Sequence, residues 1–447
     1  MIYCINYKRS NQTFSVETSL STLFFREETM KKLLIAVLCL MLTGCAAPAP
    51  SDGSGPDRSV SPDIPAPSPV ASSAPNGESG TPQASPETDP ETAENPSASQ
   101  EPSESSLGPQ NQEQIIQELL SAMTLEEKVG QMFFVRCPET GGAELAAQYK
   151  VGGYLLFGRD FKDKTAQQVR DDIQSYQDAS GIPLLIGTDE EGGTVVRASS
   201  NPDLFPQREP APQTLFAQGG MDLILQDARQ KSMTLLDLGV NVNFAPVADV
   251  STDPADFIYA RSFGQDAQAT ANYVAQVVGV MGEEQIGSVL KHFPGYGNNV
   301  DTHTGIALDQ RPYETFQTSD FLPFQGGIQA GADAVLVSHN IAASMDESLP
   351  ASLSPTVHKV LREELGFDGV VLTDDLAMDA VMEYAQNGSA AVLAIQAGND
   401  MVVTTDFQTQ IPQVIHAVQS GVIAESQIDQ AVTRVLNWKY ELGLLGN

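Results

Sequence analysis

The 447-residue chain has few basic residues. Lysine and arginine number 24 against 57 aspartates and glutamates, which gives a formal net charge of −33. Charge-driven binding to nucleic acid or to an anionic lipid surface needs a field of the opposite sign. We therefore expect neither partner, whereas a neutral ligand such as a sugar meets no such objection.

Cysteine is also scarce, and three of the four cysteines lie in the first 45 residues. Met30 to Lys32 supplies a basic start, residues 33–42 form an apolar run too short to span a membrane as a mature helix, and Leu42 to Cys45 reads as a bacterial lipobox. Residues 1–45 are therefore expected to be an N-terminal extension and a lipoprotein signal peptide, with translation from Met30. The signal peptide would be cleaved before Cys45, and the sulfur of Cys45 would carry a lipid.

The lipid on Cys45 predicts an extracytoplasmic protein held at the outer face of the bacterial cell membrane. The anchor would be its only contact with the membrane. Once the signal is removed, Cys137 is the one cysteine not committed to lipid, which excludes a disulfide framework and a cysteine metal site within one chain. Cys137 follows an expected strand, so we expect it to be buried as a small apolar residue.

Residues 46–111 have the composition of a linker. They hold 14 of the 28 prolines and ten acidic residues against one arginine, without apolar periodicity. Such a segment cannot bury a core, and it predicts a disordered tether with a root-mean-square span of roughly 45 Å. The folded domain is then residues 112–447.

Within residues 112–447, short apolar runs alternate with amphipathic segments. The latter have helical periodicity and cover residues 165–180, 222–238, 267–284 and 355–365. Continuous apolar strands between helices indicate a parallel sheet covered on both faces. Eight such units predict a (β/α)8 TIM-type barrel, with a doubly wound open sheet as the alternative. The strands are expected near residues 130–135, 153–157, 184–188, 242–245, 288–291, 334–338, 370–373 and 401–404.

Side chains that can carry charge or exchange protons follow these strands. The catalytic edge of such a barrel is where its strands end, and the residues expected there are Arg159, Asp189, Asp249, Lys291, His292, His339, Asp374 and Asp375. By contrast, His358 and His416 lie within helical segments and Trp438 within an amphipathic C-terminal helix, so we expect these three to have packing or surface roles.

The segment from Lys291 to His303 contains a lysine, two histidines and an aspartate. Its proline and glycines predict a loop. Because Asp301 and His303 are two residues apart on a turn, the carboxylate can hold one ring nitrogen while the other faces a substrate. This is the layout of an acid/base histidine, and a solvated surface turn is the alternative.

Two further clusters lie at expected strand ends. Asp189 begins a Glu-Glu-Gly-Gly turn with Arg197 eight residues on, a pairing that suits the gripping of hydroxyl groups or, alternatively, an internal salt bridge. Asp374 and Asp375 follow a buried strand directly. Adjacent side chains diverge at a strand end, so we expect one carboxylate to reach a reacting atom and the other to orient a neighbour.

With these residues in place, the chain resembles glycoside hydrolase family 3, specifically its β-N-acetylhexosaminidases. The resemblance implies that Asp374 is the nucleophile and that His303, paired with Asp301, is the general acid/base. It also implies that Asp189, Arg197, Arg261, Lys291 and His292 hold the sugar at the −1 subsite. The matching motifs are Asp189 to Arg197, Phe244 to Asp249, Arg261 to Phe263, Lys291 to Gly297, Asp301 to His303 and Thr373 to Leu376.

The resemblance predicts a retaining exo-β-N-acetylglucosaminidase that removes terminal β-linked GlcNAc, without a cofactor or a metal. A lipid anchor and tether would place it beside wall-derived GlcNAc-MurNAc fragments, and we expect a monomer. Tyr296 departs from the family, since many members have a second histidine in that turn, and loop geometry and pH profile are expected to differ.

Several alternatives stay open at this point. A histidine acid/base is neutral once it has given up its proton and would not repel an anionic acceptor, so GlcNAc phosphorolysis is one variant. A substrate-assisted mechanism, in which Asp374 and Asp375 polarise the acetamido group, is another. A family 3 β-glucosidase is a third, although the Asp301 and His303 pair argues against it, and a non-catalytic sugar-binding lipoprotein is the fourth.

Overall fold

The computed structural model describes residues 109–299, 307–378, 381, 384 and 389–446. Its centre is an eight-stranded parallel sheet in the order β10-β1-β2-β3-β4-β5-β7-β9. All eight strands expected from the sequence are present. They are β1 (Phe133–Arg136), β2 (Gly153–Leu156), β3 (Leu185–Thr188), β4 (Val242–Asn243), β5 (Gly287–Phe293), β7 (Ala334–Val337), β9 (Val370–Thr373) and β10 (Val402–Thr404).

The two outer strands of that order, β9 and β10, come together and nearly close the ring. Leu372 and Met401 form a parallel bridge, and the backbone N–H of Thr373 donates to the carbonyl of Met401 at 3.3 Å. The N–H of Leu376 donates to the carbonyl of Val403 at 2.9 Å. The fold is therefore a (β/α)8 TIM-type barrel, and the open-sheet alternative is wrong.

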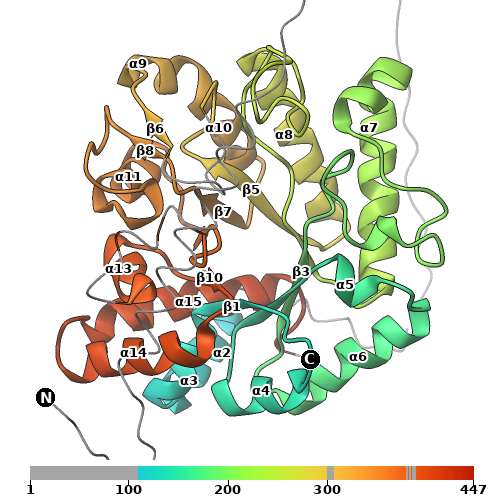
Figure 1. Ribbon diagram of the computed structural model, residues 1–447. Helices are drawn as coiled ribbons and strands as arrows, with labels where there is room; N and C mark the ends of the chain where they lie inside the picture. Colours follow the sequence, from blue (N-terminus) through green and yellow to red (C-terminus); the bar gives the residue numbers. More distant parts are fainter. Residues whose placement is uncertain (1–108, 300–306, 379–380, 382–383, 385–388, 447) are drawn as a thin grey trace, which may run out of the picture. The chain divides into compact units, whose positions relative to one another are not determined.

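Helices surround the strands (Figure 1). Where the sequence offers caps they are used: Thr165 and Gln168 form a capping box at the start of α6, and Asp266 accepts from the N–H of Ala269 at the start of α8. The helices are α2 (Pro109–Ala122), α3 (Leu125–Gln131), α4 (Gly142–Tyr149), α5 (Gly158–Phe161), α6 (Ala166–Ala179), α7 (Pro212–Asp237), α8 (Ala267–Glu283), α9 (Tyr313–Thr315), α10 (Phe321–Gln329), α11 (Pro355–Lys359), α13 (Ala390–Ala397), α14 (Phe407–Gln419) and α15 (Glu425–Glu441).

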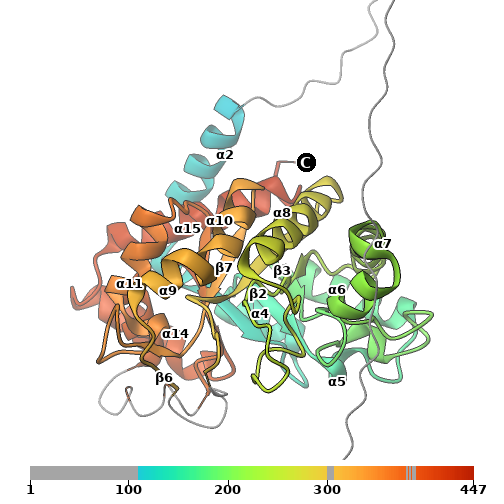
Figure 2. The same ribbon diagram turned by 90° about the horizontal axis from the view of Figure 1, so that it is seen from above.

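The two ends of the barrel differ. Figure 2 shows α2 and the C-terminus on one side, and α5 and the short strand β6 (Leu308–Asp309) on the other. β6 pairs with β8 (Ile341–Ala342) in a separate two-stranded sheet. Because α5 follows β2 directly and β8 follows β7, this second side carries the carboxyl ends of the barrel strands, where a site is expected.

Several element boundaries differ from those expected; the first strand, for example, begins at Phe133 because residues 130–131 belong to helix α3. Strand β5 continues to Phe293, two residues beyond the end expected at Lys291, so His292 belongs to a strand and not to the predicted loop; the carbonyl of Lys291 accepts from the N–H of Ala248 at 2.7 Å. Helix α7 begins at Pro212, with Gly220 in a non-helical conformation, which hides the earlier turns from a periodicity search. Helix α2 begins at Pro109, slightly before the boundary expected at 111/112.

The interior of the barrel is packed with side chains. Phe134 and Phe244 meet edge to face with ring centroids 5.2 Å apart, and a Cβ on Gly187 would lie 2.7 Å from the Phe244 ring. Trp438 on α15 is 2% exposed and packs over Gly287, which confirms its expected role as a core anchor. The barrel is therefore a solid support for its strand ends.

Cys137 is buried, as expected, and burial raises the pKa of its thiol to about 12. A thiol so far from ionisation is a poor nucleophile. Among the helices that the structure describes, none combines the length and apolar character needed to cross a bilayer.

Candidate active site

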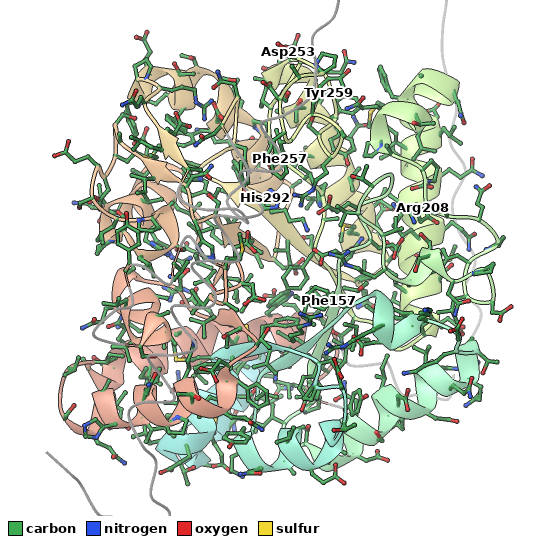
Figure 3. All side chains as sticks on the ribbon, in the orientation of Figure 1. Phe157, Arg208, Asp253, Phe257, Tyr259 and His292 are labelled. Carbon is green, nitrogen blue, oxygen red and sulfur yellow. The ribbon has the colours of Figure 1, made fainter. Side chains whose placement is uncertain are left out.

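A cavity of about 320 Å³ opens at the carboxyl ends of the strands. Figure 3 labels two of its lining residues, His292 and Phe157. Six residues expected to form the site share this cavity although they come from different parts of the chain: Asp189, Arg197, Arg261, Lys291, His292 and Asp374.

Lys291 lies at the centre of the charged network. Its Nζ is 2.6 Å from Asp189 Oδ1 and 2.6 Å from Glu191 Oε1, and its side chain is only 3% exposed. Burial acts to raise the pKa of Glu191, but Lys291 and then Arg261 outweigh it, so this pKa lies well below its usual range. Glu191 is therefore a permanent anion that compensates the buried cations.

Arg261 bridges Glu191 and His292. Its guanidinium binds Glu191 through Nε at 3.0 Å and Nη2 at 2.8 Å, and Nη2 also lies 3.0 Å from His292 Nε2. Because a guanidinium only donates, Nε2 is the acceptor of this contact, and Nδ1 is then the nitrogen that donates to Asp249 Oδ2 at 2.7 Å. The contacts therefore match the Nδ1–H tautomer of the ring.

Asp249 ties the end of β4 to the end of β5. Besides the ring of His292, it accepts from the backbone N–H of His292 at 3.1 Å and from that of Tyr296 at 2.8 Å. The rings of His292 and Tyr296 meet edge to face, with centroids 5.2 Å apart. Asp249 therefore sets the backbone from which the predicted acid/base segment departs.

The Glu-Glu-Gly-Gly turn positions Arg197. Buried Glu190 accepts from the backbone N–H groups of Arg197 at 2.9 Å and Ala198 at 2.7 Å, while Arg197 Nη2 lies 3.3 Å from Asp189 Oδ2. Gly192 has a φ of 95°, and a Cβ there would lie 2.2 Å from the carbonyl oxygen of Pro210. The turn requires glycine for both reasons.

Asp374 and Asp375 both line the cavity and have different hydrogen-bond partners. The N–H of Asp374 donates to the carbonyl of Val337 at 2.9 Å, and its Oδ1 accepts from the N–H of Asp375 at 2.8 Å. Asp375 accepts from the N–H of Ala377 at 2.9 Å, and burial raises its pKa. Buried His339 contacts the carbonyl of Asp375 through Nε2 at 3.0 Å, so it supports this strand end from behind.

The predicted acid/base pair, Asp301 and His303, lies outside the described residues, as does the predicted lipidation site Cys45. Two other residues expected at strand ends have different surroundings. Arg159 forms an ion pair with Glu139, and His339 is fully buried. The catalytic and sugar-binding roles of the six cavity residues stay predictions.

Two residues of the cavity and its charged network, Arg136 and Glu191, are not among the side chains predicted at the strand ends. The sequence carries a signal for both, because Arg136 ends β1 and Glu191 follows β3. Asp249 is predicted at a strand end, but its partner His292 is visible only in the structure.

Comparisons with known proteins identify relatives of this chain. A family model described as the glycosyl hydrolase family 3 N terminal domain matches residues 124–438. A beta-hexosaminidase of Stenotrophomonas maltophilia (strain R551-3) is 35% identical over 318 residues, which cover 68% of this chain and 89% of that protein. A beta-hexosaminidase of Nitrosomonas eutropha is 32% identical, with 60% and 78% covered.

Solved structures resemble the fold as well. A glycoside hydrolase family 3 beta-N-acetylglucosaminidase from Paenibacillus sp. str. FPU-7 superposes with a TM-score of 0.66 at 31% identity, over 73% of this chain. The match spans 64% of that longer protein. A family 3 member from Mycobacterium smegmatis superposes with a TM-score of 0.65 at 28% identity, covering 73% of this chain and 99% of its own.

Proposed function

The chain belongs to glycosyl hydrolase family 3 and is a glycosidase, and on that premise we propose that it is a retaining exo-β-N-acetylglucosaminidase with Asp374 as its nucleophile. The observation that carries the proposal is the single cavity that Asp374 shares with Asp189, Lys291 and the other predicted sugar-binding residues. Its volume of about 320 Å³ suits one sugar unit, near the lower bound for small-molecule sites.

The charged network binds that sugar. Asp189 and Lys291 are held 2.6 Å apart before substrate arrives, so their spare donors and acceptors are oriented toward the cavity without reorganisation. The ring of His292 adds a polar edge to the cavity, and its contact with Asp249 at 2.7 Å fixes its orientation. The sugar's hydroxyl groups would replace water on these groups and set the anomeric carbon against Asp374.

The chemical steps follow from a retaining mechanism. The Asp374 carboxylate attacks the anomeric carbon and forms a glycosyl-enzyme while the leaving oxygen takes a proton; water then hydrolyses that ester with the same acid/base in its basic form. We assign the acid/base role to His303, oriented by Asp301. That assignment rests on the sequence, because neither residue is described in the structure.

We further propose that the substrates are peptidoglycan-derived GlcNAc-MurNAc fragments and that the enzyme acts outside the cell, anchored through Cys45. Two relatives support the substrate class by their names, which are beta-hexosaminidase and beta-N-acetylglucosaminidase. The predicted lipobox and Pro-rich tether support the location.

Turnover of a chromogenic aryl β-GlcNAc tests the activity. We expect Asp374→Asn to lower kcat by at least about 1000-fold, and His303→Ala to cause a loss that shrinks as the leaving group improves, because a good leaving group needs less protonation. Asp368→Asn, which alters an exposed aspartate before the same strand, is the matched control and should leave kcat unchanged.

Two comparisons separate the rival functions. An aryl β-glucoside turned over faster than the aryl β-GlcNAc would identify a β-glucosidase. Sugar 1-phosphate formed on adding phosphate would identify a phosphorylase, and absence of turnover of any aryl glycoside would support a non-catalytic sugar-binding protein.

A further inference from the structure

Two carboxylates behind the Glu-Glu-Gly-Gly turn share one cation. Glu209 is 8% exposed, and its Oε2 lies 3.6 Å from Lys231 Nζ. Asp227 Oδ2 lies 3.1 Å from the same nitrogen, one helical turn away on α7. Within the described part of the chain, neither carboxylate forms a second ion pair. If all three side chains were ionised, the cluster would therefore carry one negative charge in excess.

Little water can reach that excess charge. A cavity of about 30 Å³ lies between the turn, α7 and α8, and it has room for only about two water molecules. Asp227, Lys231 and Glu190 help to line it. Glu209 Oε2 is enclosed and accepts no hydrogen bond from any described residue. A carboxylate without solvent or a full partner is strongly destabilising in its ionised form.

A proton removes this conflict. Burial raises the pKa of Glu209 to about 8; Lys231 lowers it, while the anions Asp227 and Glu190 raise it. Burial acts to lower the pKa of Lys231, but Asp227 and then Glu209 outweigh it, so the lysine stays charged. The charged or titratable groups around Glu209 are Lys231 and Asp227 on α7 and Glu190 on the turn, and Tyr273 on α8 faces Asp227. A hydrogen bond between two carboxyl groups requires one proton, which Glu209 supplies.

Glu209 is also bound to the turn through its backbone. Its N–H donates to Ser199 Oγ at 3.0 Å, and its carbonyl accepts from the N–H of Gly193 at 2.9 Å. The Ser199 hydroxyl donates to Glu190, which accepts from the N–H of Arg197 at 2.9 Å. A displacement of Glu209 is therefore transmitted to Arg197 in the active-site cavity.

We propose that Glu209 is a positioning residue that acts in its protonated form, in which its carboxyl group donates to Asp227 and the pair balances Lys231. The kinetic part of this inference rests on the proposed function. When Glu209 loses the proton, the new anion repels Asp227 and Glu190 and shifts the turn that holds Arg197. Sugar binding then weakens at alkaline pH for a reason that is separate from the acid/base group.

The pH profile of kcat/KM tests this role. The substrate is an aryl β-GlcNAc whose leaving group needs no protonation, so ionisation of the acid/base group does not contribute. The unaltered protein should show a fall with a midpoint near pH 8 and lose about tenfold by pH 9, mainly through KM. Glu209→Gln keeps a hydrogen-bond donor but cannot ionise, so it should keep most of its activity at pH 7 and lose this fall.

Two variants accompany that measurement. Glu209→Ala removes the donor, so its KM should already be raised at pH 7, and the contrast with Glu209→Gln identifies the hydrogen bond as the cause. Glu283→Gln is the matched control, because Glu283 forms an exposed pair with Arg229 on the outside of the same helices. It should show the same fall as the unaltered protein.

Urea unfolding detects the proton without any turnover. Between the ordinary pKa of 4.5 and the folded value of about 8, the folded chain binds a proton that the unfolded chain lacks, so stability falls as pH rises. From pH 6 to pH 8 the unfolding equilibrium constant should rise about 50-fold more in the unaltered protein than in Glu209→Gln. Asp227→Asn lets Glu209 ionise opposite Lys231, so it should lose this dependence too, and it decides the question if Glu209→Gln does not fold.

Equal pH dependence of unfolding in the unaltered protein and in both amide variants would overturn the shared proton. An alkaline fall of kcat/KM that persists in Glu209→Gln would overturn the positioning role. If the unaltered protein cleaves no aryl β-GlcNAc at any pH, the proposed function fails, and the unfolding measurement still decides whether Glu209 holds the proton.

Discussion

At the scale of single residues, the buried positive and negative charges of the cavity neutralise one another. The side chains of Lys291 and Glu191 are 3% and 2% exposed, and they lie 2.6 Å apart. A buried charge without a partner is strongly destabilising. Each member of the network is therefore needed to keep the others ionised in place.

Replacing Glu191 with glutamine should disrupt both binding and folding. The change leaves Lys291 and Arg261 short of an anion, so we expect a loss of about 3–5 kcal/mol in the free energy of unfolding. We also expect kcat/KM for an aryl β-GlcNAc to fall by at least about 100-fold, the effect of displacing positioning groups by 1 Å. Urea unfolding and steady-state kinetics measure the two effects.

Glu363→Gln is the control for that prediction. Glu363 makes an exposed pair with Lys359 at 3.6 Å, and such pairs contribute little. Equal behaviour of the two variants would show that the Glu191 network does not support the site.

The sequence could predict the residues that face the cavity but not the residues that hold them. Asp189, Lys291 and Asp374 each end or follow an apolar strand, so their edge of the sheet was predictable. Glu191 and Asp249 bind other side chains across the barrel. Those partnerships depend on distances between strands far apart in the chain, which spacing does not contain.

At the scale of elements, strands were easier to predict than helix limits. Continuous Val, Ile, Leu and Phe runs are distinctive, and all eight central strands were found. Helix α7 begins well before the expected residue 222 because Gly220 interrupts its periodicity. Closure between β9 and β10 could not be read from the sequence, because it depends on the accumulated tilt of all the strands.

Helix α15 carries a buried lysine that predicts a pH dependence of stability. Lys439 is 0% exposed, its Nζ donates to Gln131 Oε1 at 2.6 Å, and burial lowers its pKa to about 7 from 10.5. Between these values the unfolded chain binds a proton that the folded chain does not. Stability should therefore rise with pH from about 7 toward 10, at about 1.4 kcal/mol per unit.

Urea unfolding at pH 7 and pH 9 measures this dependence. The unaltered protein should gain roughly 2–3 kcal/mol over this interval relative to Lys439→Met, which has no proton to release. Lys359→Met, at an exposed lysine, should show the unaltered slope. Identical slopes for the unaltered protein and Lys439→Met would contradict the assignment.

At the scale of the whole molecule, the part of the chain that the structure describes begins with helix α2. Ile116 is 2% exposed, and Gln112 Nε2 donates to Asn437 Oδ1 at 3.0 Å, so α2 packs on the C-terminal helix α15. We predict that removing residues 1–108 leaves kcat/KM on a soluble aryl β-GlcNAc within about twofold, because the composition of residues 46–111 predicts a tether and residues 1–45 are expected to be an extension and a signal peptide.

Removing residues 1–123 is the matched comparison, because it also takes away Ile116. Loss of such a buried side chain costs about 2–5 kcal/mol, so the midpoint of thermal unfolding should fall. A shorter chain that melts at the same temperature would show that α2 does not belong to the folded unit.

The predicted anchor is tested by Cys45→Ala. Without the thiol no thioether to lipid can form, so labelled fatty acid should appear in the unaltered protein expressed in bacteria and be absent from the variant. Equal labelling of both proteins, or of neither, would show that Cys45 does not carry the lipid.

The central claim is that Asp374 attacks the anomeric carbon of a sugar held in this cavity. Incubation with a slow fluorinated glycoside, followed by proteolysis and peptide mass spectrometry, tests it most directly. We predict one covalent sugar on the peptide containing Asp374, localised to that carboxylate by fragmentation and absent in Asp374→Asn. An adduct on Asp375, or no adduct on any residue while the glycoside is still consumed, would contradict it.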